Sequence, residues 1–297
     1  MRKAYKILLG VFLLLLPILI WADQRLLPSM ILIPEVKETE YLISKVLIED
    51  GIDVRHYFTT SFDNLKLDMA LVETDSARGT IILLHGVGNS KGALSAKAKW
   101  LHSIGFNALL VDQRAHGKSE GKYCTYGFHE QKDVSAIVDM LEANKVPGPY
   151  GVWGISMGGS VATLSLASEP RLSFGIIQST FCNLNEIVAD YQSKIFGFPM
   201  PYLANRGLSQ AGKLADFDPK KVNPLELIKT ISQPVFISHG DADEFIKFEY
   251  GEQLFNAVSH TNKIFYAVPN AGHLDWWEMG AEEYKSALSD FLNSLIN

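Results

Sequence analysis

A serine lies at the centre of the sequence Gly154-Ile-Ser156-Met-Gly158, between an apolar run and an Ala/Leu-rich helical pattern. This order predicts a strand that turns sharply into a helix, with the serine at the corner. The two glycines lack a Cβ, so neighbouring backbones can come close enough to form such a corner. The hydroxyl of Ser156 would then lie at the positive end of the helix, where it can act as a nucleophile. Serine is also a favoured helix N-cap, so the motif alone does not decide its role.

A serine nucleophile needs a histidine to take its proton and a carboxylate to fix the tautomer of that histidine. Two later apolar runs end in loops that offer these groups: residues 234–239 precede Asp243, and residues 263–268 precede His273. Each candidate follows the C-terminal end of a predicted strand, which is the edge where open α/β sheets bind ligands. We therefore predict a triad of Ser156, Asp243 and His273.

The chain resembles the α/β-hydrolase superfamily over about residues 65–295, because five motifs occur in the expected order. They are His85-Gly86-Val87-Gly88, Asp112-Gln-Arg114-Ala-His-Gly117-Lys-Ser119, the serine corner, His239-Gly240-Asp241-Ala-Asp243 and Gly272-His273. Within the superfamily the chain is most similar to small esterases and to lysophospholipase- or monoacylglycerol-lipase-like enzymes, and less so to prolyl-oligopeptidase-type peptidases. Ala115 departs from the pattern, since many relatives carry glycine there. We expect this difference to shift a loop without changing the chemistry.

The resemblance implies a serine hydrolase that cleaves a carboxylic ester of a small acyl substrate through an acyl-enzyme. The backbone N–H groups of Val87 and Met157 would form its oxyanion hole. No cofactor and no metal ion are expected, because the eight histidines are scattered along the chain. Two alternatives stay open. One is a peptidase acting on short peptides, and the other is a non-catalytic binding protein on a hydrolase scaffold.

Several polar residues near the triad have simpler explanations than catalysis. Asp241 and Glu244 compete with Asp243 for the role of the acid, but the superfamily pattern favours Asp243. We expect Asp241 to cap its loop instead. His85 and His239 each end a strand before a glycine, and we expect them to brace loops through hydrogen bonds.

Composition limits the class of protein. A length of 297 residues with 47% hydrophobic residues suits one large α/β domain, which we assign to residues 41–297. The net charge of −6 argues against nucleic acid as a partner. The oligomeric state stays open.

The N-terminus is predicted to be a separate element. Basic residues at positions 2, 3 and 6 precede an almost wholly apolar run over residues 7–21. Such a pattern is typical of a signal peptide, and it also fits an uncleaved membrane anchor. We assign residues 1–22 to one of these and residues 23–40 to a connector. Either assignment places the catalytic domain outside the cytoplasm (periplasmic or secreted) or on a membrane.

Alternating strand and helix patterns predict an α/β-hydrolase fold, a mostly parallel sheet with helices on both faces. Strands are expected at residues 42–49, 65–73, 80–85, 107–112, 150–154, 174–179, 234–239 and 262–268. Helices are expected at residues 93–104, 129–144, 157–168 and 282–295.

Residues 182–232 have no place in this sheet and are predicted to form a small helical cap over the pocket. Apolar residues at positions 181, 195, 196, 198, 200 and 202 would form its underside and select an acyl chain. The alternative is that they form a satellite core. The two cysteines, Cys124 and Cys182, are expected to be separate thiols, although one disulfide is possible outside the cytoplasm.

Overall fold

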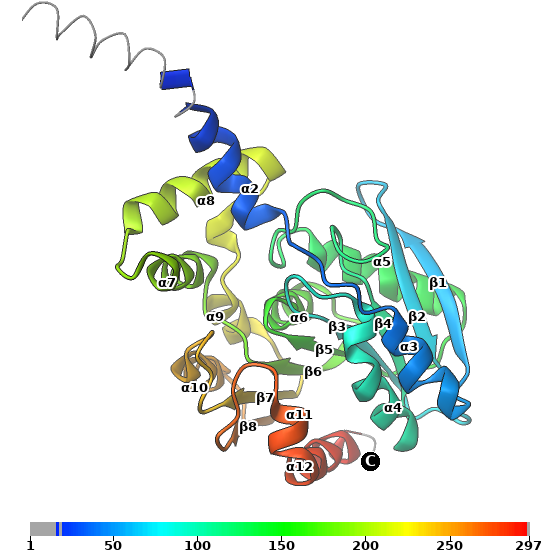
Figure 1. Ribbon diagram of the computed structural model, residues 1–297. Coiled ribbons are helices and arrows are strands. Elements are labelled where there is room, and N and C mark those ends of the chain that lie inside the picture. Colours follow the sequence, from blue (N-terminus) through cyan, green and yellow to red (C-terminus); the bar gives the residue numbers. More distant parts are fainter. Residues whose placement is uncertain (1–15, 18–19, 296–297) are drawn as a thin grey trace, which may run out of the picture.

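The computed structural model describes residues 16–17 and 20–295. An eight-stranded sheet forms its centre, with helices on both faces (Figure 1). The strands are β1 (Val54–Thr60), β2 (Lys66–Val72), β3 (Thr80–Leu84), β4 (Asn107–Val111), β5 (Tyr150–Ile155), β6 (Leu172–Gln178), β7 (Val235–Gly240) and β8 (Lys263–Val268). Their order is β1-β2-β4-β3-β5-β6-β7-β8. β2 is antiparallel to both neighbours and all other pairs are parallel, which confirms the predicted fold class.

The central strands are apolar throughout because both sheet faces are covered. On β3, Ile82 and Leu84 belong to one core cluster, and Ile81 and Leu83 to the other. The first cluster packs against α5 (Glu130–Ala143), α6 (Met157–Ser168), α9 (Pro224–Leu227) and α10 (Phe248–Ala257). The second packs against α3 (Tyr41–Val46), α4 (Ser95–Ser103) and α12 (Ala281–Ser294).

The strand predicted at residues 42–49 is wrong. This segment forms α3 and the short 3₁₀ helix η2 (Ile48–Asp50). Ile43 and Leu47 are buried, and their spacing of four residues places them on one helical face. The sheet begins instead at β1, an edge strand on which every residue is exposed or partly exposed.

The N-terminal part of the described chain packs against the cap. The π-helix η1 (Ala22–Leu26) and α2 (Leu27–Leu32) pack against α8 (Pro201–Ala215), which α2 crosses (Figure 1). The carboxylate of Asp23 accepts hydrogen bonds from Arg206 Nε at 2.7 Å and Nη2 at 2.6 Å, and Leu32 is fully buried. Most of residues 1–22, the predicted signal peptide or anchor, lie outside the described residues. Among those described, no helix is long and apolar enough to cross a bilayer.

Residues 182–232, all of them described, contain helices and no strand. The main helices are α7 (Leu184–Phe196) and α8, followed by η4 (Pro219–Lys221), α9 and η5 (Ile228–Thr230). Helix α7 begins where Asn183 Oδ1 accepts a hydrogen bond from the N–H of Glu186 and ends at Gly197, whose φ of 77° suits glycine. We call residues 182–232 the cap.

The six apolar side chains predicted for the cap differ in exposure, and one of them, Met200, is partly buried. Phe181 is buried in the main core. Ile195, Phe196, Phe198 and Tyr202 are exposed, which contradicts the alternative of a satellite core at these four positions. They lie at the turn between α7 and α8.

Cys124 and Cys182 are both buried and free, which agrees with the expectation of two separate thiols. The Cys182 thiol lies 3.7 Å from the carbonyl oxygen of Tyr250.

Candidate active site

Ser156 occupies a sharp corner between β5 and α6. Its φ of 57° and ψ of −118° are unusual for a residue with a side chain, so the surrounding structure must hold it there. A Cβ on Gly154 would lie 1.9 Å from Gly158 O, and a Cβ on Gly158 would lie 2.2 Å from Leu84 O. Both positions therefore require glycine. The N–H of Ser156 donates to Gln178 O at 2.9 Å, which ties the corner to β6.

Asp243 and His273 are joined by a hydrogen bond. Asp243 follows β7 and His273 follows β8, and His273 Nδ1 lies 2.7 Å from Asp243 Oδ2. The other oxygen, Oδ1, accepts from the N–H groups of Phe245 at 2.8 Å and Ile246 at 2.9 Å. The Asp243 carboxylate is fully buried, and the side chain of His273 is 10% exposed. The pair is therefore held in one orientation, in which His273 Nε2 is not used by the bond to Asp243.

The electrostatics keep Asp243 ionised. Burial raises the pKa of its carboxyl group, but hydrogen bonds from His239 and His273 outweigh burial and hold the pKa well below its usual value. His239 Nε2 lies 3.4 Å from Asp243 Oδ2 and 3.0 Å from Ile246 O. His239 thus braces the acidic loop, as predicted. Asp241 Oδ1 accepts a hydrogen bond from the N–H of Asn270 at 2.6 Å, so Asp241 joins its own loop to the loop after β8.

All three predicted triad residues lie at the same edge of the sheet. Ser156, Asp243 and His273 each follow the C-terminal end of a parallel strand, and β5, β7 and β8 lie within four neighbouring strands. The structure joins Asp243 directly to His273. It places Ser156 two strands from β7, across β6.

The loop after β3 passes directly over Ser156. A Cβ on Gly86 would lie 3.2 Å from Ser156 Cβ and 3.7 Å from its Oγ. Val87 is 40% exposed, and Met157 is the first residue of α6, where a backbone N–H has no carbonyl in its own helix. In the described part of the chain, neither of these two N–H groups has a hydrogen-bond acceptor. They are the donors predicted for an oxyanion hole.

Two buried histidines fix the conformation of this loop. His85 Nδ1 donates to Gly86 O at 2.8 Å, while its Nε2 accepts from the N–H of Gln113 at 3.2 Å. His116 binds the backbone of the same loop in a similar way, because its Nε2 accepts a hydrogen bond from the N–H of Gly88 at 3.2 Å. Complete burial, together with repulsion from His116, lowers the pKa of His85 to about 3, and burial also lowers the pKa of His116. Both rings are therefore neutral near pH 7, the state that these hydrogen bonds require.

A buried lysine that the sequence pattern does not predict anchors the same loop. Lys91 Nζ lies 2.8 Å from Asp112 Oδ2, 2.6 Å from Asp68 Oδ1 and 2.9 Å from Glu40 Oε2. Burial lowers the pKa of Lys91, but hydrogen bonds to these carboxylates outweigh burial and raise the pKa above its usual value. The N–H of Lys37 also donates to Gly88 O at 2.8 Å. Residues 37–40 are therefore part of the scaffold of the loop.

The cap reaches the Asp243–His273 pair through α7. Lys194 Nζ lies 5.3 Å from the ring centre of Phe245, and that ring lies 5.8 Å from the ring of His273. Asp190 Oδ2 accepts from Tyr250 Oη at 2.7 Å, which fixes α7 against α10. Lys194 and Phe245 were not predicted, because nothing in the local sequence indicates that they meet.

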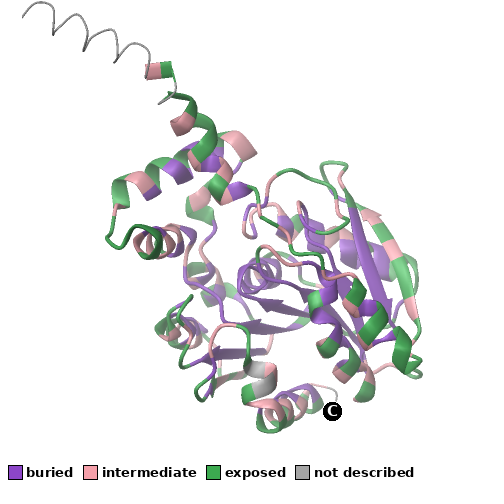
Figure 2. Cartoon of the chain, viewed as in Figure 1, coloured by how far each residue is buried: buried purple, intermediate pink, exposed green. Residues whose placement is uncertain are grey.

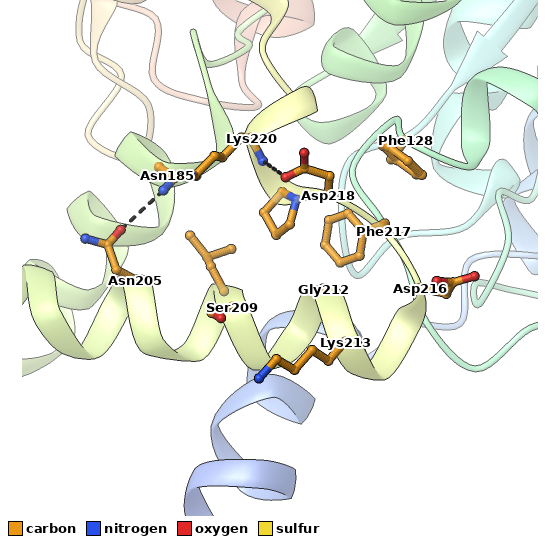
Figure 3. A pocket seen from close by; sticks show the side chains of 12 residues that line it. Phe128, Asn185, Asn205, Ser209, Gly212, Lys213, Asp216, Phe217, Asp218 and Lys220 are labelled. Atoms are coloured by element: carbon orange, nitrogen blue, oxygen red, sulfur yellow. Dashed lines mark hydrogen bonds between the residues drawn. The ribbon is translucent and has the colours of Figure 1, made fainter.

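A cavity of about 880 Å³ lies elsewhere, between α7, α8 and η4 (Figure 3). Lys213 and Lys220 line it together with Asp216 and Asp218. None of the three predicted triad residues is among the described residues that line it. We therefore place the candidate chemistry at the sheet edge and not in this cavity.

No group of three or more His, Cys, Asp or Glu side chains in the described part of the chain is arranged to hold a metal ion. The proposed chemistry does not require one.

Comparison with known proteins identifies the fold. An esterase of Pyrococcus furiosus superimposes with a TM-score of 0.74 at 26% identity, over 90% of this chain and 99% of that chain. The chain therefore has an α/β-hydrolase fold. A family model described as serine aminopeptidase, S33, matches residues 75–216 of this α/β-hydrolase, a span that includes Ser156.

Curated relatives of this α/β-hydrolase are distant. The uncharacterized protein YqkD of Bacillus subtilis is 28% identical over 73% of this chain and 72% of its own length. A lysophosphatidylserine lipase of Danio rerio is 26% identical over 64% of this chain and 50% of its own length.

Proposed function

We propose that this α/β-hydrolase is a serine esterase that cleaves carboxylic esters of small acyl substrates through an acyl-enzyme. One observation carries the proposal. The 2.7 Å hydrogen bond between Asp243 and His273 lies at the same sheet edge as the strained corner of Ser156. A hydrogen bond donated by His273 Nδ1 leaves Nε2 free to accept a proton, which is what a serine nucleophile needs.

In the proposed first step, His273 Nε2 takes the proton of the Ser156 hydroxyl as Oγ attacks the ester carbonyl carbon. Asp243 stabilises the imidazolium that forms. The backbone N–H groups of Val87 and Met157 donate to the oxyanion, and a donor of this kind contributes about 10²–10³-fold to kcat. The tetrahedral intermediate then collapses: the ester C–O bond breaks, His273 protonates the leaving alcohol, and the acyl group stays on Ser156 Oγ.

In the second step, water attacks the acyl-enzyme while His273 takes its proton. Collapse of the second tetrahedral intermediate breaks the bond to Ser156 Oγ, which recovers its proton from His273. The products are a carboxylic acid and an alcohol, and the enzyme is regenerated without a cofactor.

Similarity favours an ester over a peptide substrate. The Pyrococcus furiosus protein, similar over nearly the whole chain, is named as an esterase, and the Danio rerio relative is named as a lipase of lysophosphatidylserine. The name of the family model, serine aminopeptidase, supports a peptidase as the second candidate. Both candidates use the same triad, so a substrate assay must separate them.

The test compares hydrolysis of p-nitrophenyl acyl esters of increasing chain length with hydrolysis of aminoacyl-nitroanilides. We expect turnover of the esters, and a loss of at least about 10³-fold in kcat for Ser156→Ala. Ser168→Ala, an exposed position at the far end of α6, is the matched control and should retain full activity. Faster turnover of the nitroanilides would favour the peptidase. A Ser156→Ala enzyme with more than a few per cent of wild-type kcat would exclude a serine mechanism.

We further propose that residues 1–22 place the catalytic domain outside the cytoplasm, either as a cleaved signal or as a retained anchor. The basic residues followed by the apolar run over 7–21 support this. N-terminal sequencing of the mature protein after fractionation separates the two cases. Recovery of the intact chain in the soluble cytoplasm would contradict both.

A further inference from the structure

The end of α7, the turn after it and the start of α8, which together we call the cap tip (residues 195–202), expose large apolar side chains. Ile195 is 68% exposed, Phe198 57% and Tyr202 81%. Phe196 beside them is 47% exposed. Exposed apolar side chains that occur singly need no explanation, but four within residues 195–202 indicate a surface that meets an apolar partner.

The N-terminal helices add to this exposed surface. Trp21 is 57% exposed and Met30 65% exposed. Asp23 of η1 binds Arg206, which lies one helical turn after Tyr202 on the same face of α8. The N-terminal helices therefore pack on the same helix, α8, that begins at the cap tip, and much of this part of the chain is exposed (Figures 1 and 2).

We propose that the cap tip and the N-terminal helices form one surface that inserts shallowly into a lipid bilayer. In the sequence, an apolar run over residues 7–21 ends at Trp21, where the exposed N-terminal helices begin. Trp, Tyr and Phe side chains suit the interface between lipid headgroups and acyl chains. Exposed basic residues, Arg25 and Lys194, flank the surface and complement anionic headgroups.

This surface ends beside the candidate active site. Lys194, the residue before Ile195, covers Phe245, and Phe245 contacts His273. Docking of the cap tip on lipid would bring the rim of the site to the bilayer surface, where acyl esters are concentrated. That consequence rests on the proposed esterase function, whereas the docking itself does not.

The test uses the full chain with a single reporter. Phe198→Cys carries an environment-sensitive fluorophore, and labelling is selective because Cys124 and Cys182 are buried. Burial also raises the pKa of Cys182 to about 12, so its reactive thiolate is scarce. The matched control is Phe58→Cys, a similarly exposed phenylalanine on β1, at the far edge of the sheet. The Phe198→Cys and Phe58→Cys variants are each made with and without Ser156→Ala, so that lipid binding is measured independently of catalysis.

Labelled protein is mixed with phosphatidylcholine–phosphatidylglycerol vesicles containing lipids with a nitroxide on the acyl chain. We expect a blue shift and strong quenching at position 198, little change at position 58, and no effect of Ser156→Ala. Vesicle binding without a change in the fluorescence of the label at position 198 would mean that residues 1–22 alone attach the protein. That result would overturn the proposal. Failure to bind vesicles would also overturn it. A blue shift at position 198 without vesicles that grows with protein concentration would assign the surface to a second copy of the chain instead.

Discussion

The ammonium group of Lys91 lies 2.8 Å from the carboxylate of Asp112, and neither side chain is exposed to solvent. This ion pair links the loop that passes over Ser156 to the residue that follows β4. Asp68 and Glu40 share the same ammonium group, so one cation holds together three acidic groups from separate segments.

Lys91→Met should therefore destabilise the protein strongly, since it leaves the buried Asp112 carboxylate without a cation. Breaking a buried pair in this way costs about 3–5 kcal/mol of unfolding free energy. The control is Lys118→Met, which removes an exposed partner of the same Glu40 and should cost less than about 1 kcal/mol. Urea unfolding measures both. Equal losses for the two variants would mean that the buried bond has no special role.

Asp243→Asn should lower kcat for ester hydrolysis by about 10³–10⁴-fold, because an amide neither fixes the tautomer of His273 nor stabilises its charged form. Asp241→Asn should lower kcat by less than about tenfold, because Asp241 only supports the backbone at Asn270. Steady-state kinetics with one ester substrate compare the two. A larger loss for Asp241→Asn would reverse the assignment of the acid.

Buried His85 predicts a loss of stability toward acid pH. Its pKa is about 3 in the folded protein, whereas the pKa of an exposed imidazole is 6.5. The stabilising contribution is therefore complete above pH 6.5 and is lost as the pH falls, because only the unfolded chain takes up the proton. Between pH 7 and pH 5 this histidine should remove about 2 kcal/mol of unfolding free energy.

Urea titrations at several pH values test this. His85→Asn should show a smaller slope of unfolding free energy against pH, whatever its absolute stability. His56→Asn, at an exposed position on β1, should keep the wild-type slope. An unchanged slope in His85→Asn would show that other groups control acid unfolding.

Ala115→Gly should stabilise the protein. Ala115 has a φ of 61°, in the left-handed region that favours glycine, so the loop keeps the backbone conformation that glycine would adopt there. Relief of this strain should add about 0.5–1 kcal/mol to the unfolding free energy. Ala167→Gly in α6 should instead cost about 1 kcal/mol, because its backbone is helical. Thermal unfolding distinguishes the two, and a loss of stability in Ala115→Gly would contradict the argument.

Much of the fold could be predicted because the central strands are continuous apolar runs. β3 and β4 are buried at every residue, so local composition was enough to find them. Residues 42–49 were mistaken for a strand because their β-branched and apolar residues suggested one. The positions that are actually buried there, Ile43 and Leu47, follow a helical period. β1 and α10 were missed.

The candidate triad could be located because each of its residues sits in a local motif after a strand. The contacts that support the candidate site could not be predicted, because they join segments far apart in the sequence. Lys91 lies in a Ser-Lys-Gly sequence that looks like an exposed loop, and its partners Glu40, Asp68 and Asp112 are distant along the chain. His116 likewise meets Gly88 only in the folded protein. The strength of a buried ion pair or a neutral histidine depends on a packing environment that no local pattern records.

The segment before the hydrolase domain is short and is held by contacts along most of its length. Residues 22–32 are helical and lie against α8, and Lys37 is already bonded to the loop over Ser156. The eleven helical residues span roughly 16 Å. An enzyme tethered to a membrane through so short and stiff a spacer could not explore the bulk solution. Its rate would follow the number of substrate molecules per unit of membrane area, and diluting the substrate with inert lipid would slow it even at constant total concentration.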